Sequence, residues 1–129
     1  MAQRSVPDMY MKLKRRHAGL FAAAEALGQA ARKEGPLDGR QAQLIQLAAA
    51  AAIRSEGAVH SHTRRALESG ATPEEVRHTL VLLVSTIGFP SVVAATSWAE
   101  DIIEGKAKPA RSTTRTPAPK TAPERRRSR

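Results

Sequence analysis

Helix-start and helix-stop signals occur at short intervals along the first 105 residues, so the chain can form only short helices that pack on one another. The clearest start is Thr72-Pro73-Glu74-Glu75, in which Thr72 can cap the helix, the proline suits its first position and Glu75 can close a capping box. Asp8 and Asp38 can cap two further helices. The stop signals are Gly35-Pro36, Gly57, Gly70, Gly88 and Pro90.

These signals and the apolar spacing between them predict an all-α domain over residues 1–105. No strand pattern and no internal repeat is visible. The segment that Thr72 opens is apolar nearly all round, so we expect it to be buried. The expected helices cover residues 8–34 with a break near Gly19, then 38–53, 58–69, 72–87 and 91–104. In the second of them one face is shared by Leu44, Leu47, Ala48, Ala51 and Ala52.

Residues 106–129 differ in composition from the rest of the chain. They hold nine Lys and Arg residues against one acid, Glu124, and so contribute +8 of the formal net charge of +9. Prolines, serines and threonines accompany these charges, and no large apolar side chain is present. Such a segment cannot bury enough apolar surface to offset its ordering entropy, so we predict a disordered basic tail.

Cysteine is absent, which excludes disulfides, thiolate nucleophiles and cysteine metal sites. A basic cluster at residues 12–16 precedes LFAAAEAL, but Glu25 interrupts this apolar run and no signal-peptide cleavage pattern follows. The most apolar stretch, TLVLLVSTIGF, has about half the length that a membrane span needs. We therefore expect a soluble cytoplasmic protein with no membrane contact.

Two histidines and a glutamate gather in SEGAVHSH, residues 55–62. His60 and His62 are two residues apart and point to roughly opposite sides of a helix, so a two-histidine metal clamp is disfavoured. We expect no metal and no cofactor. The i, i+4 spacing places His60 between Glu56 and Arg64, which predicts a solvated surface histidine.

The spacing of His62 differs from that of His60. His62 follows Val59 by three residues and precedes Ala66 by four, so it should face the apolar side of the same helix. A partly buried imidazole needs a hydrogen-bond partner, and its pKa is easily moved. This position suits a structural histidine as well as a chemical one.

The segment from Leu37 to Pro90 resembles the carboxymuconolactone decarboxylase / alkyl hydroperoxidase D-like family. The matching stretches are LDGRQAQLIQLAAAAAI, then HTRRALESGATPEEV, then the break GFP before the last helix. The resemblance implies an alkyl hydroperoxidase D-like helical bundle that assembles into dimers, trimers or hexamers. It covers about half of the chain closely, and the flanking helices fit more loosely.

In the hydroperoxidase branch of the family that the chain resembles, the site pattern is CxxCxxxH, with a glutamate twelve residues before the first cysteine. Aligned on His62, the two cysteine positions fall on Ser55 and Ala58, and the glutamate position falls on Gln43. Serine cannot replace a redox cysteine, alanine has no chemistry and glutamine cannot take up a proton. Only the histidine of this set is kept, so the resemblance does not extend to a peroxidase activity.

The decarboxylase branch also lacks the cysteine pair and keeps the histidine, which is thought to transfer a proton on an anionic lactone. The resemblance therefore implies a non-redox lyase or isomerase that acts on a small anionic substrate. In that hypothesis His62 is the general acid or base, while Gln43 and Ser55 hydrogen-bond. Arginines that could bind a carboxylate are Arg40, Arg54, Arg64 and Arg65.

Two hypotheses of other classes stand beside the enzyme. The chain could be a non-catalytic member of the family that binds a ligand or only assembles. It could also be an oligomer whose basic tails contact nucleic acid without sequence preference, because the tail is strongly basic and has no aromatic residue. A basic, proline-rich terminus can equally serve solubility alone.

Overall fold

The computed structural model describes residues 8–105. Every regular element in this range is a helix, which confirms the predicted all-α class. The elements are α1 (Asp8–Arg16), α2 (Ala18–Lys33), α3 (Gly39–Ala52), α4 (Glu56–Glu68), α5 (Pro73–Val81), α6 (Val84–Ile87) and α7 (Phe89–Ile103). The predicted basic tail lies outside the described residues.

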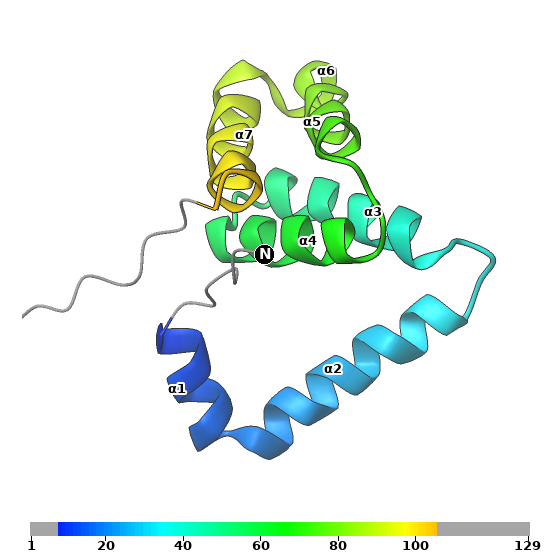
Figure 1. Cartoon of the computed structure of the whole chain (residues 1–129), viewed down its shortest axis with the longest axis vertical. Coiled ribbons are helices and arrows are strands. Elements are labelled where there is room, and N and C mark those ends of the chain that lie inside the picture. Colours follow the sequence, from blue (N-terminus) through cyan, green and yellow to red (C-terminus); the bar gives the residue numbers. More distant parts are fainter. Residues whose placement is uncertain (1–7, 106–129) are drawn as a thin grey trace, which may run out of the picture.

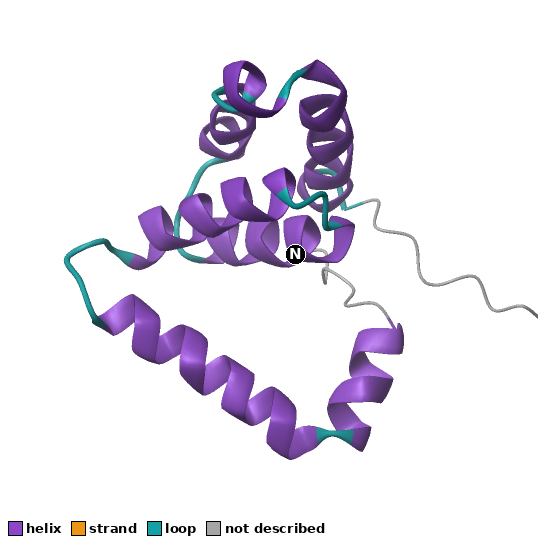
Figure 2. Cartoon of the chain, turned by 180° about the vertical axis from the view of Figure 1, so that it is seen from behind, coloured by secondary structure: helices purple, strands orange, loops and turns teal. Residues whose placement is uncertain are grey.

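The core is formed by α3, α4, α5 and α7. Helices α3 and α4 lie side by side, and α5 and α7 stand on them (Figures 1 and 2). The largest fully buried side chains there include Leu47, Val59, Val76 and Leu80. Between them sit small buried residues, which let the helix backbones approach closely. These are Ala50, Ala51, Ala66, Ala95 and Ala99.

Helices α1 and α2 form an arm that extends away from this core (Figure 1). Neither helix contains a buried residue, and Leu20 and Leu27 of α2 are 68% and 73% exposed. Contacts within the arm hold its two helices together. The Tyr10 and Phe21 rings meet edge to face with centroids 5.3 Å apart, and Lys14 pairs with Glu25 at 3.1 Å.

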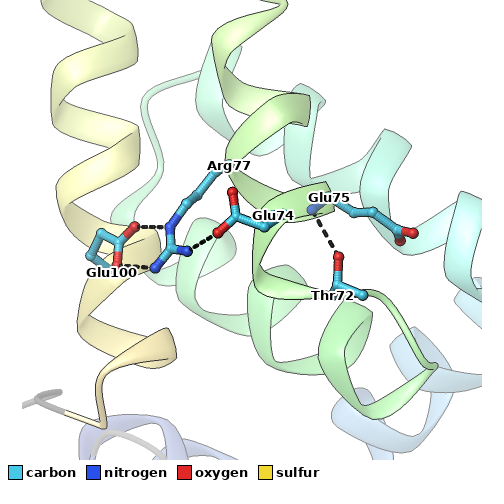
Figure 3. A network of polar contacts seen from close by, with 5 residues as sticks. All are labelled: Thr72, Glu74, Glu75, Arg77 and Glu100. Atoms are coloured by element: carbon cyan, nitrogen blue, oxygen red, sulfur yellow. Dashed lines mark hydrogen bonds and ion pairs between the residues drawn. The ribbon is translucent and has the colours of Figure 1, made fainter.

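Local capping explains where the core helices begin. The Asp38 side chain accepts from the backbone N–H of Gln41, and the backbone N–H of Asp38 donates to Oε1 of Gln41, so α3 starts with a complete capping box. Thr72 accepts from the backbone N–H of Glu75 at the start of α5, as predicted (Figure 3). The second half of that predicted box is replaced, because Glu75 Oε1 accepts from Arg40 Nη1 at 2.8 Å.

The predicted break near Gly19 is found at His17. Three other boundaries differ from the prediction. Helix α4 begins at Glu56 with Gly57 inside its first turn, and α7 begins at Phe89 with Pro90 in its first turn. The predicted single helix 72–87 is divided at Leu82 and Leu83. There the backbone changes to tighter bonds, from the Leu83 N–H to the Leu80 carbonyl and from the Thr86 N–H to the Leu83 carbonyl, so the chain bends between α5 and α6.

Two predictions of burial also need correction. Val81 and Leu82 are 57% and 61% exposed, so the segment expected to be buried presents apolar side chains to solvent in the single chain. On α3 the buried face includes Gln43 and Leu47, whereas Ala52, which was expected on it, is exposed. The helix is therefore rotated slightly from the orientation that its alanines predicted.

An arginine joins the two upper helices of the core. The Arg77 guanidinium of α5 donates from Nε and Nη2 to the two carboxylate oxygens of Glu100 in α7, at 2.6 and 3.1 Å (Figure 3). Its Nη1 donates to Glu74 at 2.5 Å. These bonds raise the pKa of Arg77 and lower that of Glu100, so the bridge is fully ionised near neutral pH. Within residues 8–105, no helix has both the length and the apolar character needed to cross a bilayer.

Candidate functional site

Gln43 and His62, both predicted as site residues, are brought together by the pairing of α3 with α4. The Oε1 atom of Gln43 lies 2.9 Å from Nδ1 of His62. Gln43 is only 5% exposed, and His62 is half-buried beside the fully buried Val59 and Ala66. The predicted inward orientation of His62 is thus confirmed.

This contact determines which nitrogen of His62 holds the proton. An amide oxygen can only accept, so Nδ1 carries the hydrogen and donates it to Gln43. The neutral ring then keeps a lone pair at Nε2. A glutamine at this position orients the ring but cannot remove its proton, unlike a carboxylate.

The environment of His62 favours the neutral imidazole. Burial lowers the pKa of His62 below its usual value of 6.5, and the positive charges of Arg65, Arg32 and Arg64 lower it further. A neutral ring with a free Nε2 is equipped to take up a proton at neutral pH. The same positive charges would attract an anion to its vicinity.

A cavity of about 430 Å³ lies between the arm and α4. Arg32 of α2 and Arg65 of α4 both contribute to its wall, so two of the three arginines that act on His62 also line the cavity. A Cβ built on Gly28 would lie 3.3 Å from Nη1 of Arg32, so this guanidinium packs against the Gly28 backbone. The remaining lining residues are Tyr10, Phe21, Ala24, Glu25 and Gln29.

Positive charge exceeds negative charge in the lining of this cavity. The only carboxylate in its lining, Glu25, already pairs with Lys14. Among the described residues, Arg32 and Arg65 have no ion-pair partner. The cavity therefore carries uncompensated positive charge, which suits a small anion. His62 and Gln43 are not among its lining residues, and the link to His62 is the charge of Arg32 and Arg65.

Ser55 lies at the N-terminus of α4 and not in the cavity wall. Its Oγ accepts from the backbone N–H of Ala58 at 3.3 Å, which makes it the N-cap of this helix. Ser55 and Ala58, the two positions aligned with cysteines, thus interact through a cap. The structure does not bring Ser55 into contact with His62 or Gln43.

The other sequence candidates have separate positions. The prediction that His60 is solvated was wrong, because its side chain is 15% exposed and Nε2 lies 3.3 Å from Oδ2 of Asp101 in α7. Arg40 pairs with Glu75, and Arg54 is exposed at the end of α3 with a positive φ of 57°. Sequence reasoning missed Arg32, because its contribution depends on where the arm lies.

Comparisons with known proteins identify the family and the fold. The sequence model of the carboxymuconolactone decarboxylase family matches residues 18–101. The fold is similar to the crystal structure of an apo carboxymuconolactone decarboxylase family protein from Legionella pneumophila, with a TM-score of 0.63 and 31% identity. That likeness covers 74% of this chain and 86% of the other chain. No curated protein sequence matches the chain.

Proposed function

The chain belongs to the carboxymuconolactone decarboxylase family, and we propose that it is a non-redox member that moves a proton on a small anionic substrate through His62. A lyase or isomerase activity fits this chemistry, because both depend on proton transfer at carbon. The observation that carries the proposal is the neutral His62, held by Gln43 and subject to the charges of two arginines that line a cavity. A thiol peroxidase is not proposed, because the chain has no cysteine.

Each residue has a distinct role in this proposal. In an isomerisation, Nε2 of His62 takes the proton from one carbon of the substrate and returns it to a neighbouring carbon. In a decarboxylation, the bond between the carbon and the carboxylate breaks, CO₂ leaves, and Nε2 delivers to the carbanion a proton that it has taken from water. Gln43 positions the ring through Nδ1. Arg32 and Arg65 bind the carboxylate of the substrate and stabilise the charge that develops when the proton leaves. Ser55 contributes indirectly, by capping the helix that carries His62.

Decarboxylation of carboxymuconolactone, the compound in the family's name, provides a direct test. Turnover is followed by the loss of substrate, with the wild type, His62→Ala and His78→Ala compared at neutral pH. His78 is an exposed histidine of α5 and serves as the matched control. We expect His62→Ala to reduce the rate by about 10²- to 10⁴-fold and His78→Ala to leave it unchanged.

A binding measurement separates loss of chemistry from loss of affinity. The same compound is titrated while the ring signals of His62 are followed by NMR. We expect these signals to shift in the wild type and to shift much less in Arg65→Gln. Equal turnover in His62→Ala and the wild type would contradict the proposed role of His62.

We also propose that the functional form is a homo-oligomer, a dimer, trimer or hexamer. Apolar side chains exposed on the arm and on the upper end of the core support this proposal. They include Leu20 and Leu27 on the arm, and Val81, Leu82, Phe89 and Val93 on the core.

The alternative is a non-catalytic oligomeric binding protein whose basic tails contact nucleic acid. One observation supports it: residues 106–129 carry +8 of the net charge of +9, so attraction to phosphate would be concentrated there. In that case His62→Ala would leave the function of the protein unchanged, and removal of the tail would abolish it.

A further inference from the structure

Three side chains of the kinds that bind metals lie close together where α4 faces α7. None of them belongs to the proposed proton-transfer site, in which His62 contacts α3. The three are Glu56 and His60 of α4 and Asp101 of α7. One ligand atom from each lies within 4.8 Å of the other two. We propose that these three residues form a binding site for a divalent transition-metal ion such as Zn²⁺.

Helix geometry brings the first two ligands together. Glu56 and His60 are four residues apart on α4, so their side chains lie on the same face one turn apart. Asp101 approaches from the last turns of α7, and its Oδ2 lies 3.3 Å from Nε2 of His60. Two ligands from one helix and a third from another would let an ion join α4 to α7.

The charges around this cluster favour a cation. Glu56 and Asp101 are two carboxylates within 4.8 Å of each other. In the described part of the chain neither forms an ion pair with a lysine or arginine. His60 lies against Asp101 and carries positive charge only when protonated. A divalent ion would neutralise both carboxylates at once.

The burial of the ligands suits a site with one anchored and two adjustable ligands. The His60 side chain is 15% exposed and is held against α7, whereas Asp101 is 39% exposed and Glu56 is exposed. Solvent can therefore occupy the remaining coordination positions. One imidazole and two carboxylates form a ligand set that suits Zn²⁺ and its divalent neighbours in the first transition row better than Mg²⁺ or Ca²⁺.

This site is not the clamp of His60 and His62 that helix geometry disfavours. His62 turns toward Gln43 of α3, while His60 turns toward Asp101 of α7. The two histidines thus serve different partners. The metal would be a structural clamp between helices, independent of proton transfer at His62.

Titration of the metal-free full-length protein with Zn²⁺ alone tests the proposal. Isothermal titration calorimetry gives the affinity for the wild type, Glu56→Gln, His60→Ala and Asp101→Asn. Glu74→Gln and His78→Ala remove an exposed acid and an exposed histidine elsewhere and are the matched controls. We expect each of the three ligand substitutions to weaken binding by at least about tenfold, and the two controls to leave it unchanged.

Two further measurements keep the test decisive. Ring signals of His60 should shift on Zn²⁺ addition before those of His62 and His78 shift. Zn²⁺ should raise the Tm of the wild type but not that of Glu56→Gln, which alters only an exposed side chain and should fold normally. The proposal is overturned if the wild type does not bind Zn²⁺, or if Glu56→Gln and Asp101→Asn bind it as tightly as the wild type.

Discussion

At the scale of single residues, the amide of Gln43 distinguishes this chain from the glutamate-containing pattern that it resembles. A carboxylate at the same place would face the Nδ1–H of His62 at a distance near 2.9 Å and stabilise the imidazolium. We therefore predict that Gln43→Glu raises the pKa of His62. The measurement is an NMR pH titration of the His62 ring, with the ring of His78 as an internal reference. An unchanged or lower pKa would show that this contact does not control the histidine.

The lowered pKa of His62 also predicts how stability depends on pH. Burial disfavours the charged ring, so the unfolded chain binds the proton more readily than the folded one does. The contribution of His62 is complete above pH 6.5 and is lost as the pH falls from there through the lower pKa of the folded state.

Urea unfolding of the wild type and His62→Gln between pH 8 and pH 5 measures this contribution. We expect the stability of the wild type to fall more steeply on acidification than that of His62→Gln. His78→Gln should keep the slope of the wild type. Parallel curves for all three proteins would contradict the effect of burial.

At the scale of helices, local signals located the two capped starts and most of the ends, but not the division between α5 and α6. The caps at Asp38 and Thr72 join each capping side chain to a backbone N–H three residues later, so the sequence alone locates them. The division at Leu82 and Leu83 has no glycine or proline to mark it, because it follows from how α5 and α6 pack on the core. The first turn of α4 was missed since Gly57 resembles a break, whereas Ser55 begins the helix.

The candidate site could also be predicted only in part from the sequence. The pairing of Gln43 with His62 follows from helix spacing and family resemblance, and the structure shows the contact. The cavity and Arg32 could not be predicted, because they depend on the path of the arm between residues 34 and 38. The partnership of His60 with Asp101 joins residues 41 positions apart and requires the packing of α4 on α7.

The N-cap of α4 yields a prediction about Ser55. Loss of its hydroxyl should destabilise the protein by about 1 kcal/mol, because the backbone N–H of Ala58 loses its acceptor. Ser55→Asp should restore most of that stability, since aspartate also caps well. Urea unfolding of Ser55→Ala and Ser55→Asp is the measurement. If Ser55→Ala reduced ligand binding but not stability, Ser55 would be a binding residue and not a cap.

At the scale of the whole molecule, the exposed apolar surface predicts assembly. Val81, Leu82, Phe89 and Val93 are each more than half exposed, and they surround the junction of α5, α6 and α7. Light scattering at micromolar concentration should give a multiple of the 13.9 kDa chain mass. Leu82→Glu should lower the measured mass if this surface is the interface, while His78→Glu, an exposed substitution nearby, should not. A 13.9 kDa species with intact helicity would contradict assembly.

The concentration of positive charge in residues 106–129 predicts salt-dependent binding to nucleic acid. Residues 1–105 have a net charge of about +1 and should attract phosphate weakly, whereas residues 106–129 carry +8. If roughly half of the nine basic residues meet phosphates, log K for duplex DNA should fall with log salt at a slope of about −3 to −5, without sequence preference. An oligomer would strengthen the binding, because several tails on one core raise the effective concentration.

Deletion of residues 106–129 is the matching experiment. We expect the truncated chain to keep its fold and its mass per assembly, because the deleted segment has no large apolar side chain to pack. It should lose the salt-dependent binding that the full chain shows. A salt titration of both chains against the same duplex decides between the two uses of the tail. Equal affinities would reject contact between the tail and nucleic acid, and solubility would then be the simplest account of its charge.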